Sequence, residues 1–368
     1  MGFGPRPLRA AAPRLLLRPL LALRRFLLAL ARALSPSELS LIDLASGVAW
    51  TTLLGSAARH RLADVLGDRP RAAGELAREL SLDEDVLHRM LRTLASVGVF
   101  RLERDGRFTN NRLSRALRDD ALGQSAAFAR YLAAPASLQA WMAFETSLRA
   151  GTCAFNHAHG QDTWSYFAAH PEDGATFGQA MQGLTVGVAP LISQLYPFRE
   201  VGCVCDLGGG QGVLLSELLV RNPRLRGILC DAPERFDAAT LLFQARQVEA
   251  RVTLAPGNFF EAVPGGADCY LLKNILHDWG DARSVRLLTS VRRALPSGGR
   301  LLIVESFLPH TESRGLGPLS DVQMLVMCED GRERSEQDYA RLGTAAGLRV
   351  TRTFRSPIVD ILELTAAV

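Results

Sequence analysis

Lysine is almost absent from this sequence. Of the 42 basic residues only Lys273 is a lysine, and the others are arginines. Excess charge is also lacking, because the net charge is only +4 over 368 residues, and so small an excess does not indicate a nucleic-acid-binding protein. Lys273 is therefore singled out as an exception to a composition that otherwise favours arginine.

Cysteine pairs are missing as well. The six cysteines are scattered and no C-x-x-C pair occurs, so the sequence supports neither a disulfide framework nor a metal site. Four of them fall in apolar runs typical of strands, where a free thiol behaves as a small buried hydrophobe: Cys203, Cys205, Cys230 and Cys269. We therefore expect a reduced, cytoplasmic protein without a metal.

The first part of the chain lacks acidic residues. No Asp or Glu precedes Glu38, and charged residues or Pro19 interrupt every apolar run of residues 1–34, which argues against a membrane span. We interpret residues 1–39 as a basic, loosely ordered extension leading into a helix. A targeting peptide and a helix lying on a membrane surface are the alternatives.

Residues 40–115 are typical of a small helical domain with a hairpin. Ser81-Leu82-Asp83-Glu84 is interpreted as a capping box, and Gly98 as the end of the helix that follows. That helix is predicted to have one apolar face, made by Val86, Leu87, Met90, Leu91, Leu94 and Val97. Asp105-Gly106 then predicts a hairpin turn, which completes a winged-helix-like pattern. Acids at the start of the helix would repel phosphate, so we favour dimerisation over DNA binding.

The remainder divides into two regions. Residues 116–197 are predicted to be mostly helical and rich in aromatic residues, some of which would wall a flat aromatic substrate. Residues 198–368 alternate between strands and helices. The strands are predicted at 202–206, 226–231, 251–255, 267–273 and 299–305, and the helices at 213–221, 234–249 and 281–295. This alternation predicts a doubly wound parallel sheet, and a helix at 335–346 and runs at 348–354 and 358–365 close the chain.

A glycine-rich turn follows the first of these strands and organises the domain. Its spacing, Gly208-x-Gly210-x-Gly212, differs from the G-x-G-x-x-G of NAD-binding turns. Asp206 lies just before it, where a carboxylate would repel a pyrophosphate but suit an ammonium or sulfonium group. The turn therefore favours S-adenosylmethionine over NAD.

Polar residues follow the next two strands, at the edge where such sheets bind ligands. Asp231 ends the second strand and is predicted to hold a ribose diol, although it also suits a helix cap. Asn258 and Phe259 follow the third strand, and we expect them to bind an adenine through its amino group and its ring face.

His277 follows the fourth strand and Glu305 ends the fifth. A phenol with a pKa near ~10 must lose its proton to attack well, and histidine is the natural base at neutral pH. Because neighbouring strands of this fold end side by side, we expect Glu305 to orient His277. A buried structural histidine is the alternative interpretation.

These residues resemble those of a known family. Asp206 to Gly212, Lys273 to Trp279, Leu302 to Glu305 and Gly331 to Ser335 are similar to motifs of S-adenosylmethionine-dependent O-methyltransferases of the caffeate type, above all the bacterial branch that modifies aromatic polyketides. The resemblance covers residues 40–365. It implies a class I methyltransferase domain behind a helical dimerisation domain, and a homodimer.

The resemblance also implies roles for single residues. His277 would be the general base, bracketed by Glu305 and Glu333, and Gly208, Asp231 and Lys273 would line the donor site. Asn258 departs from the family, which usually has Asp there, so we expect weaker donor binding. Glu336 is the alternative to Glu333 as the second glutamate.

The predicted reaction is methyl transfer to a hydroxyl of a small, aromatic metabolite. Three alternatives remain at this point: a tailoring enzyme of the same fold that hydroxylates or decarboxylates, a winged-helix regulator that senses a small molecule, and a dehydrogenase. The glycine loop weighs against the last two.

Overall fold

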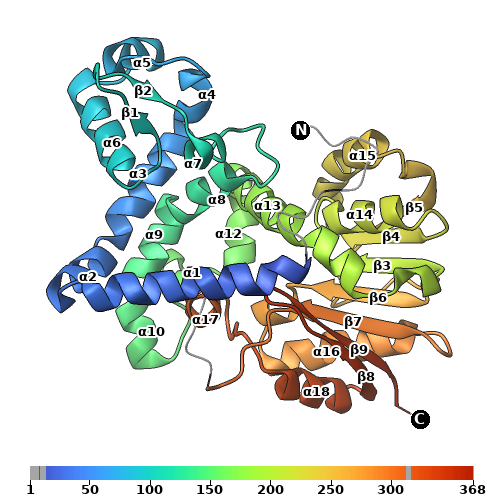
Figure 1. The fold of residues 1–368 in the computed structure, drawn as a ribbon. Coiled ribbons are helices and arrows are strands. Elements are labelled where there is room, and N and C mark those ends of the chain that lie inside the picture. Colours follow the sequence, from blue (N-terminus) through green and yellow to red (C-terminus); the bar gives the residue numbers. More distant parts are fainter. Residues whose placement is uncertain (1–7, 9–13, 312–315, 368) are drawn as a thin grey trace. The chain divides into compact units, whose positions relative to one another are not determined.

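The computed structural model describes Leu8, residues 14–311 and residues 316–367. Their contacts divide the chain into two compact units. Of the described residues, the first comprises Leu27–Leu138 and Phe167–Leu184, and the second comprises Leu8, residues 14–26, Gln139–Tyr166 and the described residues from Thr185 onward. Figure 1 shows the helices and strands of both units in chain order by colour.

The first unit consists of short helices and one small hairpin. Its elements are α2 (Ser37–Ala45), α3 (Gly47–Arg59), α4 (Leu62–Leu66), α5 (Ala73–Leu80), α6 (Glu84–Ser96), β1 (Arg101–Leu102), β2 (Phe108–Thr109), α7 (Arg112–Arg115) and α8 (Ser125–Leu132). The predicted hairpin is confirmed, since β1 and β2 pair antiparallel. Leucines of α4, α5 and α6 form a common core with Phe100 and Phe108 of the hairpin region.

Helix α6 corrects two details of the sequence analysis. Its N-cap is Asp83, whose carboxylate accepts a hydrogen bond from Val86 N at 2.9 Å, whereas Ser81 ends α5 in a left-handed conformation. The predicted capping box at Ser81 is therefore wrong, because the turn places the carboxylate nearer the free N–H groups. Leu87, Leu91 and Leu94 are buried as predicted. Val86 and Val97 are exposed instead, so the apolar face is narrower than predicted.

Further helices have residues assigned to both units or belong to the second unit. These are α1 (Arg14–Leu34), α9 (Pro135–Met142), α10 (Phe144–Ala150), α11 (Ala154–His159), α12 (Thr163–Ala169) and α13 (Pro171–Leu195). The prediction of a loose extension is wrong for Arg14–Leu34, which are helical because leucine, alanine and arginine dominate there. Residues 1–7 and 9–13 of that predicted extension lie outside the described residues.

No single described helix is long and apolar enough to cross a membrane. Only α2 and α3 taken together reach the required length and hydropathy, and they are bent by 43° relative to each other. Gly55, Ala57 and Ala58 of α3 are buried in the first unit.

A seven-stranded sheet forms the centre of the second unit (Figure 1). Its strands are β3 (Cys203–Leu207), β4 (Arg226–Asp231), β5 (Val252–Pro256), β6 (Cys269–Lys273), β7 (Arg300–Glu305), β8 (Leu348–Phe354) and β9 (Asp360–Ala366), in the order β5-β4-β3-β6-β7-β9-β8. The first five are parallel, as predicted. The last two are antiparallel, because β9 enters between β7 and β8 as the return strand of a hairpin, so the whole sheet is mixed.

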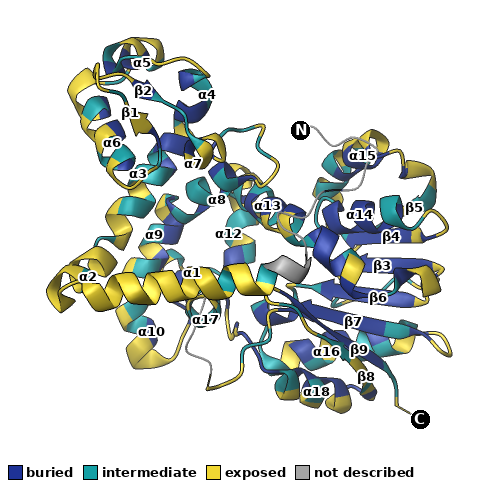
Figure 2. Ribbon diagram, in the orientation of Figure 1, coloured by how far each residue is buried: buried dark blue, intermediate teal, exposed yellow. Residues whose placement is uncertain are grey.

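Both faces of this sheet are covered, and Figure 2 shows its central strands buried. Alternate residues of β6 belong to different cores, Cys269 and Leu271 to one and Tyr270 and Leu272 to the other. The first core includes α14 (Val213–Arg221) and α15 (Phe236–Ala245), and the second includes α16 (Asp281–Ala294) and α18 (Glu336–Ala345). This arrangement is the predicted doubly wound fold.

The helical layer contains a buried ion pair. Glu217 of α14 is completely buried, and its Oε2 accepts a hydrogen bond from Arg246 Nη2 at 2.6 Å, while Arg246 is only 1% exposed. Arg221 and the backbone N–H of Leu8 also donate to this carboxylate. A charge so deeply buried is tolerated only because its partners neutralise it.

Replacement of Arg246 by methionine should therefore destabilise the protein by about 3–5 kcal/mol, because Glu217 would lose its buried partner. Equilibrium unfolding in urea measures the loss. The exposed Arg293→Met is the matched control and should stay within about 0.5 kcal/mol of the parent. Equal stability of the two variants would show that the pair contributes nothing.

Candidate active site

The parallel strands bring the predicted polar residues to one edge of the sheet. Asp231, Lys273 and Glu305 are the last residues of β4, β6 and β7, and Asp206 is the last but one of β3. Because β4-β3-β6-β7 are consecutive neighbours, these side chains follow one another along the carboxyl edge. This is the edge at which the sequence predicted both a donor site and a base.

The glycine loop adopts a conformation that depends on its glycines. Gly208, Gly210 and Gly212 all have positive φ, at 69°, 60° and 75°. A Cβ on Gly208 would lie 2.6 Å from Ile275 Cδ1, and a Cβ on Gly212 would lie 2.3 Å from Phe243 Cζ. The turn between the end of β3 and the start of α14 therefore requires glycine, both for its backbone conformation and because a Cβ would clash at Gly208 and Gly212.

Asp206, just before this loop, is a buried carboxylate. It is 3% exposed, and its Oδ2 has no hydrogen-bond partner among the described residues. Burial raises the pKa of Asp206 to about 7, and Asp231 adds to that rise, although Lys273 opposes it. A Cβ on the adjacent Gly209 would lie 2.6 Å from Asp206 Oδ2, so glycine keeps the approach to this oxygen open. A buried, unpartnered carboxylate fits a cationic ligand.

Asp231 and Asn258 are partly engaged with their own surroundings. Asp231 Oδ2 accepts a hydrogen bond from Gly210 N at 2.7 Å, and its Oδ1 accepts from Ala232 N. Asp231 therefore ties the glycine loop to the end of β4 and does not cap the following helical turn. Asn258 is exposed, and its Oδ1 accepts from Phe260 N at 3.0 Å. Phe259 is partly buried and packs against Phe260.

Lys273 connects the donor edge with the base. Burial lowers its pKa, and the opposing charges come from Glu305, Asp206 and Asp278. These carboxylates belong to three different segments, namely β7, β3 and the turn that contains Asp278. Lys273, which the sequence singled out, ends β6 at the same edge as the other predicted residues.

His277 lies in a short 3-10 turn, η4 (Leu276–Asp278), directly after β6. The ring is buried, and its Nδ1 lies 3.2 Å from Glu333 Oε1 and 3.6 Å from Glu305 Oε2. Its Nε2 lies 3.5 Å from Asp278 Oδ1. Glu305 is fixed by two backbone N–H groups, those of Ile275 and Leu276, which donate to its Oε1 at 3.1 Å each. Strand pairing thus brings Glu305 to His277 as expected.

The carboxylates around the His277 ring determine the direction in which its pKa is shifted. Burial alone would lower the pKa of His277, but Glu305, Asp278 and Glu333 outweigh it and raise the pKa to about 10. Burial raises the pKa of Glu305 to about 7, whereas the hydrogen bond from His277 helps to hold the pKa of Glu333 below its usual value despite burial. The environment therefore separates the two glutamates into one that gains a proton easily and one that stays ionised.

The structure also decides between Glu333 and Glu336 geometrically. Glu336 is the first residue of α18, where it pairs with Arg355 and accepts a hydrogen bond from Thr353. The segment before α18 holds Glu333 against the ring, because Arg332 N donates to the His277 carbonyl oxygen at 2.8 Å. Only Glu333 of these two lies beside His277.

Sequence reasoning missed three polar residues of the site. Asp278 follows His277 directly, a proximity that was visible in the chain. Ser320 and Asp321 lie on α17 (Gly317–Met327), and both bind Glu333. No spacing pattern indicated them, because 12 and 13 residues separate them from Glu333.

His277, Glu305 and Glu333 also have the composition of a metal site, since one ligand atom from each lies within 4.8 Å of the others. The Oε1 atoms of both glutamates already have protein partners, whereas their Oε2 atoms have no hydrogen-bond partner among the described residues. Glu305 Oε1 accepts two backbone hydrogen bonds, and Glu333 Oε1 is shared by His277 and Ser320. The arrangement suits a hydrogen-bonded base.

Aromatic rings surround the segment after His277. The ring of Trp279 stacks on Trp164 with centroids 5.8 Å apart, and Phe260 meets it edge-on at 4.8 Å. Arg283 lies over the same indole at 5.1 Å. Trp164 is one of the aromatic residues predicted to wall a substrate, and the structure places it in this cluster.

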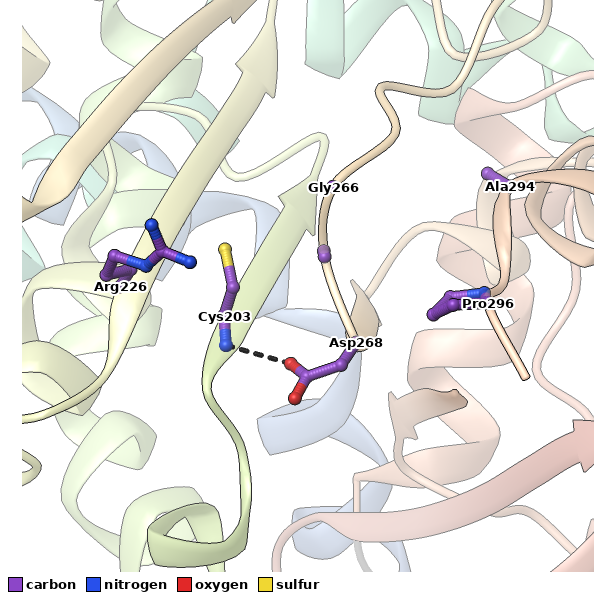
Figure 3. Close-up of a pocket in the computed structure, with 7 residues that line it drawn as sticks. Cys203, Arg226, Gly266, Asp268, Ala294 and Pro296 are labelled. Atoms are coloured by element: carbon purple, nitrogen blue, oxygen red, sulfur yellow. Dashed lines mark hydrogen bonds between the residues drawn. The ribbon is translucent and has the colours of Figure 1, made fainter. Parts of the chain in front are cut away.

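A separate cavity of about 340 Å³ lies at the opposite edge of the sheet (Figure 3). It is lined by Cys203, Arg226, Gly266, Ala267, Asp268, Ala294 and Pro296. Asp268 Oδ1 accepts a hydrogen bond from Cys203 N at 2.8 Å, so its carboxylate caps the first backbone N–H of β3. The cavity is at the amino ends of the strands and contains none of the predicted site residues.

Comparison with known proteins identifies the family of this chain. The family model of an O-methyltransferase domain matches residues 136–349, and that of an O-methyltransferase dimerisation domain matches residues 42–120. The chain is 38% identical over 332 residues to the O-demethylpuromycin-O-methyltransferase of Streptomyces alboniger, which covers 89% of this chain and 88% of the relative. The chain belongs to this O-methyltransferase family.

Solved structures of the family show the same fold. The mitomycin 7-O-methyltransferase MmcR has a TM-score of 0.84 at 33% identity, covering 92% of this chain and 100% of that one. The O-methyltransferase NcsB1 from neocarzinostatin biosynthesis, solved with S-adenosylmethionine and 2-hydroxy-5-methyl naphthoic acid, has a TM-score of 0.75 at 30% identity and covers 86% and 96%. The predicted class I fold and the S-adenosylmethionine dependence are confirmed, as is O-methylation of small, often aromatic metabolites.

Proposed function

We propose that this O-methyltransferase methylates a phenolic hydroxyl of an aromatic secondary metabolite, with His277 as the general base. One observation carries the proposal: the buried His277 ring has a carboxylate on Nδ1, 3.2 Å away. A hydrogen on Nδ1 that is donated to Glu333 leaves the lone pair of Nε2 for the proton of the acceptor. The same base supports methylation over hydroxylation or decarboxylation by this fold.

The protonation of His277 suits a phenol. Its pKa, raised to about 10 by the surrounding carboxylates, lies close to that of an ordinary phenol. Proton transfer from the phenol to the neutral ring is then nearly balanced, and because the neutral ring is the minor form below about pH 10, turnover should rise as the pH approaches that value. Glu305 and Glu333 stabilise the resulting imidazolium while the acceptor oxygen is charged. The aromatic cluster around Trp279 fits the flat ring of such an acceptor.

The donor would be held at the carboxyl edge of β3 and β4. S-Adenosylmethionine, when bound, supplies an activated methyl group on its sulfonium. Asp206, with its unpartnered buried oxygen, fits the cationic part of this molecule. Asp231 with the loop Gly208, Gly210 and Gly212 would hold its ribose, Asn258 and Phe259 its adenine, and Lys273 would balance the carboxylates. Most of the rate enhancement would come from holding donor and acceptor together.

S-Adenosylhomocysteine should therefore bind in isothermal titration calorimetry at one site per chain, and NAD should not. Asp206→Asn should weaken this binding about tenfold, since a charged hydrogen-bonding partner is lost. Folded protein that binds NAD, or that ignores S-adenosylhomocysteine, would refute the donor site.

His277→Ala should lower kcat by about 10²- to 10⁴-fold while the affinity for S-adenosylhomocysteine changes less than about twofold, because the base acts only on the acceptor. Turnover is measured with 3,4-dihydroxybenzoate as the phenolic probe, and binding by calorimetry. The exposed His310→Ala serves as the control. Turnover preserved in His277→Ala would remove His277 from the role of base.

We further propose that the protein is a cytoplasmic homodimer formed through its dimerisation domain. The domain match at residues 42–120 and the exposed apolar side chains of α2 and α3, among them Leu41, Ile42, Leu44 and Val48, support a dimer. The six buried free thiols support a reducing compartment.

Sedimentation equilibrium should accordingly give about twice the 40.0 kDa of one chain. Ile42→Asp should shift the equilibrium towards monomer, because it places a charge in an apolar contact. Leu241→Asp is the matched control, since Leu241 is also exposed, at 68% against 58% for Ile42, but lies on α15 outside that domain. A parent protein that sediments as a monomer would contradict the proposal.

A further inference from the structure

Glu333 is held in place by two residues of another helix. Ser320 Oγ of α17 donates a hydrogen bond to Glu333 Oε1 at 2.7 Å. Asp321 Oδ1, one residue along the same helix, accepts from Glu333 N at 2.8 Å. Both the side chain and the backbone of Glu333 are thus fixed from α17, although 12 and 13 residues of chain separate them.

The side chain of Glu333 is anchored through one oxygen only. Its Oε1 receives the hydrogen bond of Ser320 and lies 3.2 Å from His277 Nδ1. Its Oε2 is buried and has no hydrogen-bond partner among the described residues. Without Ser320, the longer contact with His277 would be the only one that orients the carboxylate.

Glu305 is anchored differently and competes for the same nitrogen. Its Oε1 is fixed by the backbone of Ile275 and Leu276, so its position does not depend on α17. Its Oε2 lies 3.6 Å from His277 Nδ1, which is farther than Glu333 Oε1. The hydrogen bond from Ser320 therefore bears on one of the two glutamates and leaves the other unchanged.

We propose that Ser320 is a positioning residue for the general base: its hydroxyl holds Glu333 on Nδ1 of His277, so that Nδ1 keeps its hydrogen and Nε2 faces the acceptor. The inference deepens the proposed function, because it assumes that His277 is the base. Ser320 touches neither the ring of His277 nor, in this role, the reacting atoms. It acts through Glu333.

The charge on Glu333 agrees with this role. The hydrogen bonds from His277 and Ser320 lower the pKa of Glu333 against the effect of burial, and Arg334 also helps. The titratable and charged groups around this carboxylate are His277, Glu305, Asp278, Asp321, Arg334 and Tyr339. Loss of the Ser320 hydroxyl removes a donor that favours the ionised form, so the pKa of Glu333 should rise.

The test compares Ser320→Ala with Ser320→Thr, which retains a hydroxyl on the same carbon. Protein labelled with ¹⁵N in histidine is titrated by NMR, and the ring signals of His277 are assigned by their loss in His277→Gln. In the parent, Nδ1 should carry the hydrogen of the neutral ring. In Ser320→Ala this preference should weaken and the pKa of His277 should fall by about half to one pH unit, because the carboxylate is no longer held on the ring. Ser320→Thr should restore the parent values.

Turnover of 3,4-dihydroxybenzoate gives a second readout. Ser320→Ala should lower kcat about tenfold at neutral pH. It should also move the acid limb of the kcat profile downward by about half to one pH unit, because this limb follows the pKa of the base His277, which falls when Glu333 is no longer held on its ring. S-Adenosylhomocysteine binding should be unchanged, and Ser290→Ala, which removes an exposed hydroxyl from α16, should match the parent throughout.

Unchanged His277 signals and an unchanged acid limb in Ser320→Ala would overturn the inference, as would failure of Ser320→Thr to restore them in folded protein that still binds S-adenosylhomocysteine. The proposed function fails by a different result, namely a parent protein that does not bind S-adenosylhomocysteine or a His277→Ala variant that retains turnover. The NMR arm needs no acceptor, so the two failures are distinguishable.

Discussion

Burying one histidine among carboxylates is the constraint on which the rest of this site depends. An imidazolium at the end of β6 is stable without water only because Glu305, Glu333 and Asp278 lie around the ring. Each of these carboxylates also carries a cost of burial, which other groups must offset. Backbone N–H groups do so for Glu305 and Ser320 does so for Glu333. The turn after β6, the end of β7 and the helix α17 are thus coupled through charge as well as packing.

The parallel sheet supplied most of what could be predicted. Hydrophobic alternation located β3, β4, β5, β6 and β7 within two residues, and the rule that ligands bind at the carboxyl edge then placed Asp206, Asp231, Lys273 and Glu305 together. His277 and Glu305 are neighbours because β6 and β7 pair. Local pattern and topology were sufficient for these residues, since each is fixed by the strand that carries it.

What could not be predicted depends on contacts between distant segments. Ser320 reaches Glu333 through the path of the chain between α17 and α18, and no periodicity encodes that path. The hydrogen bond that Asn258 Oδ1 accepts from Phe260 N is a local one that the sequence did not predict, and the proposed adenine contact of Asn258 stays a prediction. Similarly, Ser81 and Asp83 both suit an N-cap by residue type, and only the turn between α5 and α6 selects Asp83. The position of β9, antiparallel between β7 and β8, depends on how the whole sheet is assembled and not on any local sequence pattern.

The single lysine follows from the same electrostatics. Lys273 ends β6, which lies between β3 with Asp206 and β7 with Glu305, and both carboxylates oppose the lowering of its pKa by burial. A cation at this position interacts both with Asp206, beside the proposed donor site, and with Glu305, beside His277. Arginine would bring a larger, permanently charged group with five donors to satisfy, whereas an ammonium is compact and its pKa falls when it is buried. In a chain that uses arginine everywhere else, the space between two buried carboxylates is therefore the place where lysine is retained.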